Sequence, residues 1–80
     1  MSERITRSKR EILHLIQRYQ EDHHGKPADM LEIIALTQQT SRSMRRNCSE
    51  LLTFGYLSEH RPWVFAITDK GRELLGEANG

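Results

Sequence analysis

Apolar residues recur three and four positions apart over residues 12–19, which is the spacing of one helix face. Ser8 followed by Glu11 forms a capping box just before this stretch, and Gly25 and Pro27 interrupt the pattern after it. The pattern predicts a first helix of about four turns that runs from Ser8 to about Asp22. Its apolar positions are Ile12, Leu13, Leu15, Ile16 and Tyr19.

Two further helices with a tight turn between them are predicted next. Asp29 and Glu32 repeat the capping pattern ahead of a helix of about two turns. A run of polar residues then predicts the turn, with Thr40 or Ser41 as the next N-cap. The third helix ends at Gly55, a residue that favours a left-handed C-terminal cap. The apolar positions are Met30, Ile33, Ile34 and Leu36 in the second helix and Met44, Cys48, Leu51 and Leu52 in the third.

From residue 56 onward the pattern changes to that of β-strands. Residues 63–67 form the most β-prone run of the chain, residues 56–59 are compatible with a strand, and His60-Arg61-Pro62 is predicted to turn between them. Alternation along the second strand predicts which side chains face the core. The inward residues are Trp63, Phe65 and Ile67, and the residues of the other face are Val64 and Ala66.

A last helix follows the hairpin. Thr68 is placed to cap it, and Leu74 and Leu75 are expected to face the core. Helices and hairpin together predict an α+β fold that is mainly α, with a three-helix core, a two-stranded β-hairpin and a short C-terminal helix.

Composition indicates one small soluble domain. Eighty residues leave few apolar side chains beyond those needed for a core, and hydrophobic and charged residues make up 36% and 29% of the chain. No apolar run approaches the roughly 20 residues that span a bilayer, and the N-terminus lacks the features of a signal peptide, so we expect a cytoplasmic protein without a membrane segment. We divide it into a basic N-terminal arm (1–7), a domain (8–77) and a disordered tail (78–80). Cys48, the only cysteine, is interpreted as a small buried hydrophobe.

Positive charge is concentrated in two stretches, although the net charge of the chain is only +1. Residues 1–10 carry +3 and residues 40–61 carry +2. At about 100° per residue, Arg42 and Arg46 point away from the apolar stripe of the third helix, with Arg45 on one flank. Arginines mixed with small polar side chains are typical of a helix that enters a nucleic acid groove, whereas a solvated face, the alternative, usually interleaves opposite charges. The small polar residues are Ser41, Ser43, Asn47 and Ser49.

Three segments in this order resemble the winged helix-turn-helix superfamily: 30–37 (MLEIIALT), 43–57 (SMRRNCSELLTFGYL) and 67–75 (ITDKGRELL). The last segment is similar to the junction between wing and helix in MarR-like and PadR-like bacterial regulators. The resemblance covers residues 8–76. It implies that the third helix enters the major groove of DNA and that the hairpin, as the wing, lies along the adjacent backbone or minor groove.

The resemblance implies sequence-specific binding of double-stranded DNA by a small prokaryotic, phage or plasmid transcriptional regulator. Gln38 and Gln39 depart from the superfamily, which often has a glycine and a buried apolar residue there, and Ile34 occupies a position that is usually small. The hairpin turn also carries few basic residues. The residues expected to bind DNA are Ser41, Arg42, Ser43, Arg45, Arg46, Ser49 and Arg61.

The residues of the chain favour DNA binding over other classes of function. The sequence does not predict an enzyme, because no histidine has a Ser, Cys or acidic partner at a recognisable spacing and no glycine-rich loop could hold a phosphate. We expect no small-molecule substrate, cofactor or metal; the pair His23-His24 lacks further ligands at a suitable spacing. The alternative from another class is a protein-interaction module that uses Tyr56, Trp63 and Phe65.

The sequence is compatible with two roles for its basic N-terminal segment and with more than one kind of partner. The basic residues of the N-terminal segment either add phosphate contacts or form a basic disordered tail. A protein partner or a homodimer is compatible with the chain. The basic residues in question are Arg4, Arg7, Lys9 and Arg10.

Overall fold

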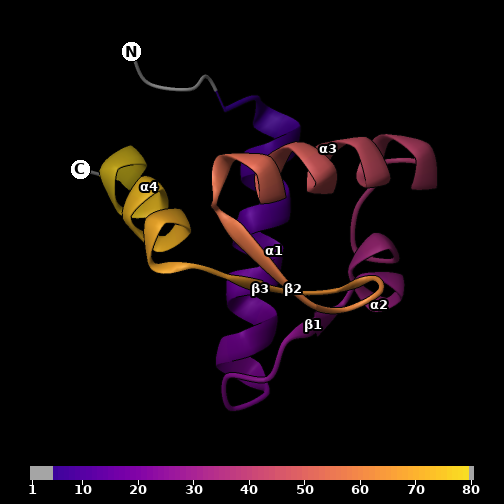
Figure 1. Ribbon diagram of the computed structural model, residues 1–80, viewed down its shortest axis with the longest axis horizontal. Coiled ribbons are helices and arrows are strands. Elements are labelled where there is room, and N and C mark those ends of the chain that lie inside the picture. Colours follow the sequence, from indigo (N-terminus) through magenta and orange to yellow (C-terminus); the bar gives the residue numbers. More distant parts are fainter. Residues whose placement is uncertain (1–4, 80) are drawn as a thin grey trace.

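A long helix (Arg7–Asp22) lies behind a small sheet, and a second long helix (Ser41–Phe54) lies above the sheet and crosses the first (Figure 1). The computed structural model describes residues 5–79, with side chains for residues 5–76. Within this range the chain is an α+β domain, mainly helical, as predicted. Its elements are α1 (Arg7–Asp22), β1 (Ala28–Asp29), α2 (Met30–Ile34), α3 (Ser41–Phe54), β2 (Leu57–Arg61), β3 (Val64–Ile67) and α4 (Asp69–Asn79).

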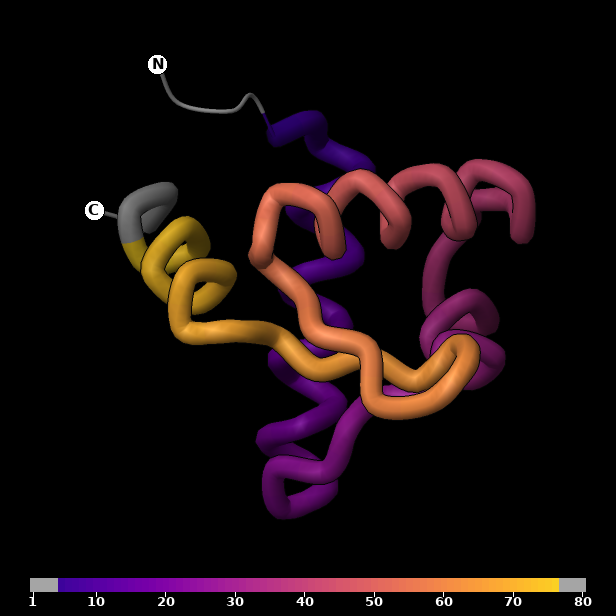
Figure 2. The backbone as a smooth tube through the Cα atoms, viewed as in Figure 1, coloured from indigo at the N-terminus to yellow at the C-terminus, as the bar shows by residue number. Residues whose placement is uncertain are grey.

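The sheet has three antiparallel strands in the order β1-β3-β2, one more than the predicted hairpin. The added strand β1 pairs Ala28 with Phe65 and Asp29 with Val64. A strand of two residues is too short to show alternation, so the sequence pattern could not indicate it. The pairing brings the start of α2 beside the turn of the hairpin, where the N–H of Met30 donates to the carbonyl of Trp63 at 2.8 Å (Figure 2).

The first helix begins one residue before the predicted start. Its N-cap is Thr6, whose Oγ1 accepts from the N–H of Lys9 at 3.2 Å, so the predicted capping box of Ser8 and Glu11 is wrong. Ser8 lies inside the helix, and Arg7, assigned to the N-terminal arm, is its first residue. Gly25 takes the left-handed conformation after the helix, with φ of 83°, and confirms the predicted stop.

The second helix is shorter than predicted. Asp29 caps it as expected, with Oδ1 accepting from the N–H of Leu31 at 2.9 Å, but Glu32 accepts from the hydroxyl of Tyr19 at 2.9 Å instead of completing a capping box. The helix ends at Ile34, so Leu36 lies in the following turn and is 66% exposed. Its predicted place on the apolar face is therefore wrong.

Both predicted ends of α3 are confirmed. Thr40 is the N-cap, and its Oγ1 accepts from the N–H of Ser43 at 3.1 Å. Gly55 takes the left-handed conformation with φ of 83°, which lets the N–H groups of Gly55 and Tyr56 bond to carbonyls of the last turn. These caps fix the length of α3 and the direction in which the chain leaves it.

The hairpin turns two residues later than predicted. His60 and Arg61 belong to β2, and the turn is formed by Pro62 and Trp63. Trp63 has φ of 67°, an uncommon conformation for a bulky residue, and is half-buried instead of fully inward. The predicted inward position is correct for Phe65 and for Ile67, which are both buried. Ala66 is buried as well, so the other face of β3 is also shielded from solvent at that residue.

Helix α4 packs closely on the hairpin at Gly71. A Cβ atom on Gly71 would lie 2.6 Å from the carbonyl oxygen of Tyr56 and 2.7 Å from Cγ1 of Ile67. Thr68 accepts from the N–H of Gly71 at 3.1 Å, which agrees with its predicted role as a cap. The helix extends to Asn79, beyond the predicted limit of the domain at residue 77.

A single core lies between the helices and the sheet. Most of its residues are the apolar positions found by periodicity, Leu75 among them, whereas Leu74 is half-buried. Gln20 is a buried polar residue that the pattern did not identify: its Oε1 accepts from the N–H of Ile67 at 2.8 Å, and its Nε2 donates to the carbonyl of Gly25 at 3.2 Å. This side chain therefore ties α1 to the end of β3.

Candidate nucleic-acid interface

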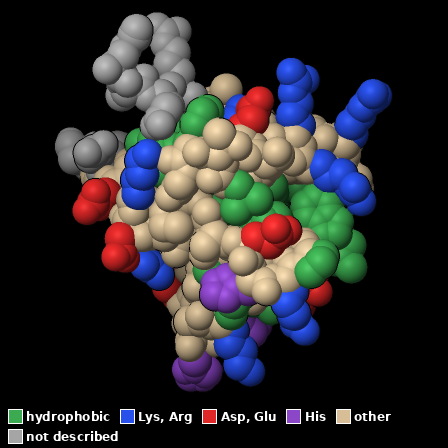
Figure 3. Space-filling model, in the orientation of Figure 1, with side chains coloured by type: hydrophobic (Ala, Val, Ile, Leu, Met, Phe, Trp, Pro, Cys, Tyr) green, Lys and Arg blue, Asp and Glu red, His purple; other side chains and the backbone are tan. Residues whose placement is uncertain are grey.

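Helix α3 has one face on the core and the opposite face in solvent. Met44, Cys48 and Leu51 are buried, as their spacing predicted. The exposed residues of the helix include five that the sequence placed in the DNA interface, and we call these five the basic face. They are Ser41, Arg42, Arg45, Arg46 and Ser49. Figure 3 shows Lys and Arg side chains projecting from the molecule along α3. Ser43, also expected there, is half-buried.

One residue of the basic face, Arg42, lies where the dipole of its own helix disfavours positive charge. Arg42 lies in the first turn of α3, which contains no acidic residue. The N-terminus of a helix carries partial positive charge, so acidic side chains there stabilise the helix and basic side chains do not. No ion pair or hydrogen bond joins the side chain of Arg42 to any other residue that the structure describes. Helix stability therefore does not explain the arginine at this position.

Arg45 and Arg46 differ from Arg42 in their surroundings. The guanidinium carbon of Arg45 lies over the ring of Trp63, 5.0 Å from its centroid. Arg46 lies near the carboxylate of Glu50, whose pKa is lowered first by its bond to Lys9 and further by the charge of Arg46. All three guanidinium groups stay exposed, so each can meet an anion from solvent.

Asn47 is not on the basic face, contrary to the sequence-based expectation. It is buried, and its Nδ2 donates to Oε1 of Gln39 at 3.0 Å. Gln39 in turn donates through Nε2 to Oε1 of Glu11 at 3.0 Å and to the carbonyl of Ser8 at 3.1 Å. Asn47 thus fixes the turn between α2 and α3 instead of facing a ligand.

A polar network, which we call the turn network, joins that turn to α1. It consists of Glu11, Thr37, Gln39 and Asn47. The hydroxyl of Thr37 donates to the same Oε1 of Glu11 at 2.5 Å, and this bond, followed by that from Gln39, lowers the pKa of the Glu11 carboxyl. Gln39 therefore attaches the turn between α2 and α3 to α1 through hydrogen bonds.

The basic residues near the N-terminus do not form a free arm where the structure describes them. Lys9 is buried, and its Nζ lies 2.6 Å from Oε1 of Glu50 on α3. Arg10 is half-buried, and its Nη1 is closed off from solvent. Arg7 is exposed in the first turn of α1, and Arg4 lies outside the described residues. Lys9 therefore positions α3 against α1 and is not available to a phosphate.

Arg61 is exposed, but it is not at the tip of the hairpin as predicted. It is the last residue of β2 and pairs with Val64 across the hairpin. The tip itself is formed by Pro62 and Trp63, which carry no charge. The hairpin therefore has Arg61 on its edge strand and an apolar tip next to Arg45.

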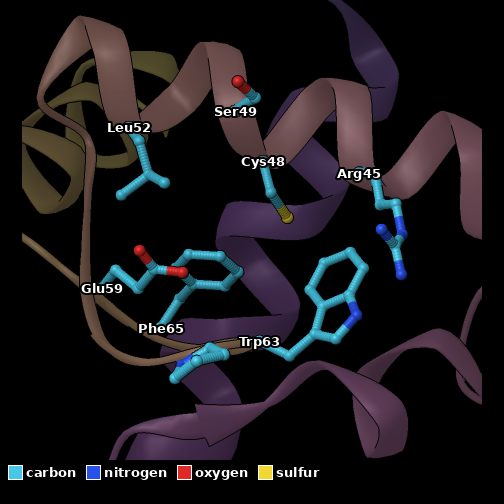
Figure 4. A pocket seen from close by; sticks show the side chains of 8 residues that line it. Arg45, Cys48, Ser49, Leu52, Glu59, Trp63 and Phe65 are labelled. Carbon is cyan, nitrogen blue, oxygen red and sulfur yellow. The ribbon is translucent and has the colours of Figure 1, made fainter.

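A shallow groove of about 460 Å³ separates α3 from the hairpin (Figure 4). Its floor is apolar, and the sulfur of Cys48 points into it. Burial raises the pKa of the Cys48 thiol to about 12, so at neutral pH the thiol is protonated and unreactive, which fits the predicted role as a buried hydrophobe. The lining residues are Arg45, Cys48, Ser49, Leu52, Glu59, Pro62, Trp63 and Phe65.

One of the two adjacent histidines, His23, contacts the last turn of α1. The ring of His23 stacks on Tyr19 with centroids 3.9 Å apart, and its Nδ1 lies 2.8 Å from the carbonyl oxygen of that residue. Across the described part of the chain, no group of three or more His, Cys, Asp or Glu side chains could hold a metal ion. The helices described there include none that is long and apolar enough to cross a membrane.

The basic face is thus held from three sides. Lys9 of α1 fixes α3 through Glu50, the turn network fixes its N-terminal end, and Trp63 of the hairpin contacts Arg45. Comparisons of the chain with protein-family models, with curated proteins and with solved structures find no match.

Proposed function

We propose that this protein binds double-stranded DNA through the basic face of α3 and acts as a small transcriptional regulator of prokaryotic, phage or plasmid type. The main support for the proposal is the cluster of three exposed arginines in α3. None of their side chains forms an ion pair or hydrogen bond with another described residue, and Arg42 lies in the first turn of the helix, where the dipole favours negative charge. The backbone phosphates of DNA carry the negative charge that binds such a cluster.

The order of the elements supports a winged helix-turn-helix as the architecture. Helices α2 and α3 follow each other through a short turn, and the hairpin of β2 and β3 comes directly after α3. Strand β1, which lies between α1 and α2 in the chain, pairs with β3 of the hairpin. This pairing places the tip of the hairpin beside the start of α2. In this proposal α3 is the recognition helix and the hairpin is a short wing.

The dimensions of α3 suit a major groove. At 1.5 Å per residue its 14 residues extend about 21 Å, and a major groove about 12 Å wide accepts one α-helix. Arg42 and Arg46 are four residues apart and so project from neighbouring turns of one face, about 6 Å apart along the axis. Both side chains are long enough to meet base edges or phosphates.

A protein-interaction module is the competing function, although the aromatic residues do not support it as predicted. Tyr56 and Phe65 are buried in the core, and Trp63 is half-buried. The observation in its favour is a different one: Leu31 and Leu36 are 69% and 66% exposed. Large apolar side chains in solvent are a feature of partner-binding surfaces, while single exposed ones are common in monomers.

Binding to random duplex DNA distinguishes the two functions. Fluorescence anisotropy of a labelled duplex, titrated with the protein at about 50 and about 200 mM salt, measures affinity and its dependence on salt. DNA binding through several arginines predicts measurable affinity at the lower salt and a steep loss at the higher salt. No binding at the lower salt would contradict the proposal and favour the interaction module.

A further inference from the structure

We propose that Trp63 is a positioning residue that holds the guanidinium of Arg45 ready to bind one backbone phosphate of the duplex. This inference rests on the proposed function and adds a division of roles among the three arginines. Arg45 becomes a fixed phosphate contact at the junction of α3 and the hairpin. Among the described residues, no aromatic ring supports Arg42 or Arg46.

Trp63 is fixed by contacts on several sides. Its carbonyl accepts from the N–H of Met30 at 2.8 Å, and its ring meets that of Phe65 edge to face, with centroids 6.1 Å apart and planes at 89°. Its backbone lies in the left-handed region, with φ of 67°. Such a conformation in a bulky residue costs free energy and persists where surrounding contacts hold it, often at functional sites. The ring is therefore a rigid support.

The contact between Arg45 and Trp63 leaves the donors of the guanidinium unused. A cation over an aromatic ring is attracted by the electrons of the ring face, which requires no hydrogen bond. Within the described residues, the side chain of Arg45 has no hydrogen-bond acceptor and no acidic partner. Its N–H groups form a planar fork that matches two oxygens of a phosphate. Arg45 can therefore bind a phosphate without leaving the ring.

The groove next to this pair determines where the phosphate lies. Arg45 and Glu59 both line it (Figure 4), and no ion pair joins them. The carboxylate of Glu59 repels an anion inside the groove, whereas Arg45 attracts one at the rim. The phosphate is therefore expected at the rim, on the side of α3, and the apolar floor stays free of DNA.

A support for Arg45 increases affinity by lowering the cost of ordering its side chain. Fixing one long, flexible side chain on binding opposes association, and a preset orientation avoids part of that cost. Loss of the support is expected to weaken duplex binding by up to about tenfold. Arg42 and Arg46 bear the full ordering cost, so Trp63 does not affect what they contribute.

A double-mutant cycle tests this division of roles. Affinity for a random duplex at low salt is measured for the wild type, Trp63→Leu, Arg45→Ala and the double variant. Because Trp63 acts through Arg45, the double variant is expected to bind no more weakly than Arg45→Ala alone. Trp63→Phe keeps an aromatic face and is expected to restore most of the affinity. Additive losses, or an unchanged affinity in Trp63→Leu, would overturn the inference.

A spectroscopic measurement tests the inference without any variant at Trp63. Trp63 is the only tryptophan, so its emission reports on the contact directly. Arg45→Ala is expected to shift the emission of the free protein, and duplex addition is expected to change the emission of the wild type far more than that of Arg45→Ala. Equal changes in both proteins would contradict the inference. A wild type that binds no duplex would instead refute the proposed function, and the inference with it.

Discussion

At the scale of single residues, the three arginines of α3 have different surroundings although all three are exposed. Arg45 lies over Trp63, Arg46 lies near Glu50, and Arg42 has neither kind of neighbour. Helical periodicity predicted the exposure of all three, because exposure depends on the angle around the helix axis. It could not predict the contact with Trp63, which depends on where a later hairpin returns.

Gly71 illustrates a residue whose importance is visible only in the folded chain. Gly71→Ala places a methyl group against the carbonyl oxygen of Tyr56 and the side chain of Ile67, so α4 has to shift. We expect a loss of about 1–3 kcal/mol in the free energy of unfolding, measured by urea denaturation. Gly76→Ala is the control: its Cβ meets no atom within 4 Å, so the variant should gain about 0.5–1 kcal/mol. Equal stability of the two variants would refute the close packing at Gly71.

At the scale of elements, the sequence predicted best those ends that depend on local chemistry. Asp29, Thr40 and Gly55 cap α2 and α3 as expected, because each acts on backbone groups within a few residues. The prediction was wrong at the start of α1, where Thr6 and not Ser8 is the N-cap. The turn network was not predicted, since Glu11 and Gln39 are far apart along the chain.

Removing Gln39 from the turn network should loosen the attachment of α3 to α1. Gln39→Met keeps the length of the side chain but leaves the buried Nδ2 of Asn47 without its acceptor. An unsatisfied buried donor costs about 1–3 kcal/mol, which chemical denaturation can measure. Gln38→Met, at an exposed neighbour, should change stability by less than about 0.5 kcal/mol. A loss no larger in Gln39→Met than in this control would show that the network does not stabilise the turn.

The same network predicts how stability depends on pH. The hydrogen bonds from Thr37 and Gln39 lower the pKa of Glu11 in the folded state. The stability that these bonds give to the ionised carboxylate is therefore fully present above pH 4.5, the pKa of Glu11 in the unfolded chain. That contribution is lost as the pH falls through the lowered pKa, where the carboxylate becomes protonated. Thermal midpoints measured from neutral pH down to about pH 3 should therefore fall less steeply for Glu11→Gln than for the wild type. Parallel curves would contradict this role of Glu11.

At the scale of the whole molecule, periodicity predicted the core and the order of most elements, but it did not predict the third strand of the sheet. Strand β1 depends on a partner, β3, that follows much later in the chain. The hairpin turns at Pro62 and Trp63, where Trp63 takes a left-handed conformation that the sequence pattern did not indicate. Both features place the hairpin tip next to α2 and α3, so the shape of the candidate interface depends on pairing that local patterns do not show.

Phe65 connects this sheet to the core, and its removal should affect the entire domain. Phe65→Ala deletes a buried ring that also contacts Trp63 edge to face. The expected cost is about 3–5 kcal/mol, close to the whole stability of so small a domain, so circular dichroism should show an unfolded or nearly unfolded chain at moderate temperature. Arg61→Ala, exposed at the end of β2, should stay within about 0.5 kcal/mol of the wild type and lose little affinity for DNA. A folded Phe65→Ala with an unchanged thermal midpoint would contradict the account of the core.

The affinity of arginine variants of α3 over a series of salt concentrations tests whether the basic face binds duplex DNA. Arg42→Ala and Arg46→Ala should each weaken binding by about 1–3 kcal/mol where the arginine contacts a base, or lower the salt slope by about one where it contacts a phosphate. Neither should change the thermal midpoint appreciably, because both side chains are exposed. Arg18→Ala, an exposed arginine of α1, is the control and should bind like the wild type. Unchanged affinity and salt slope in both α3 variants would show that duplex DNA does not bind to the basic face.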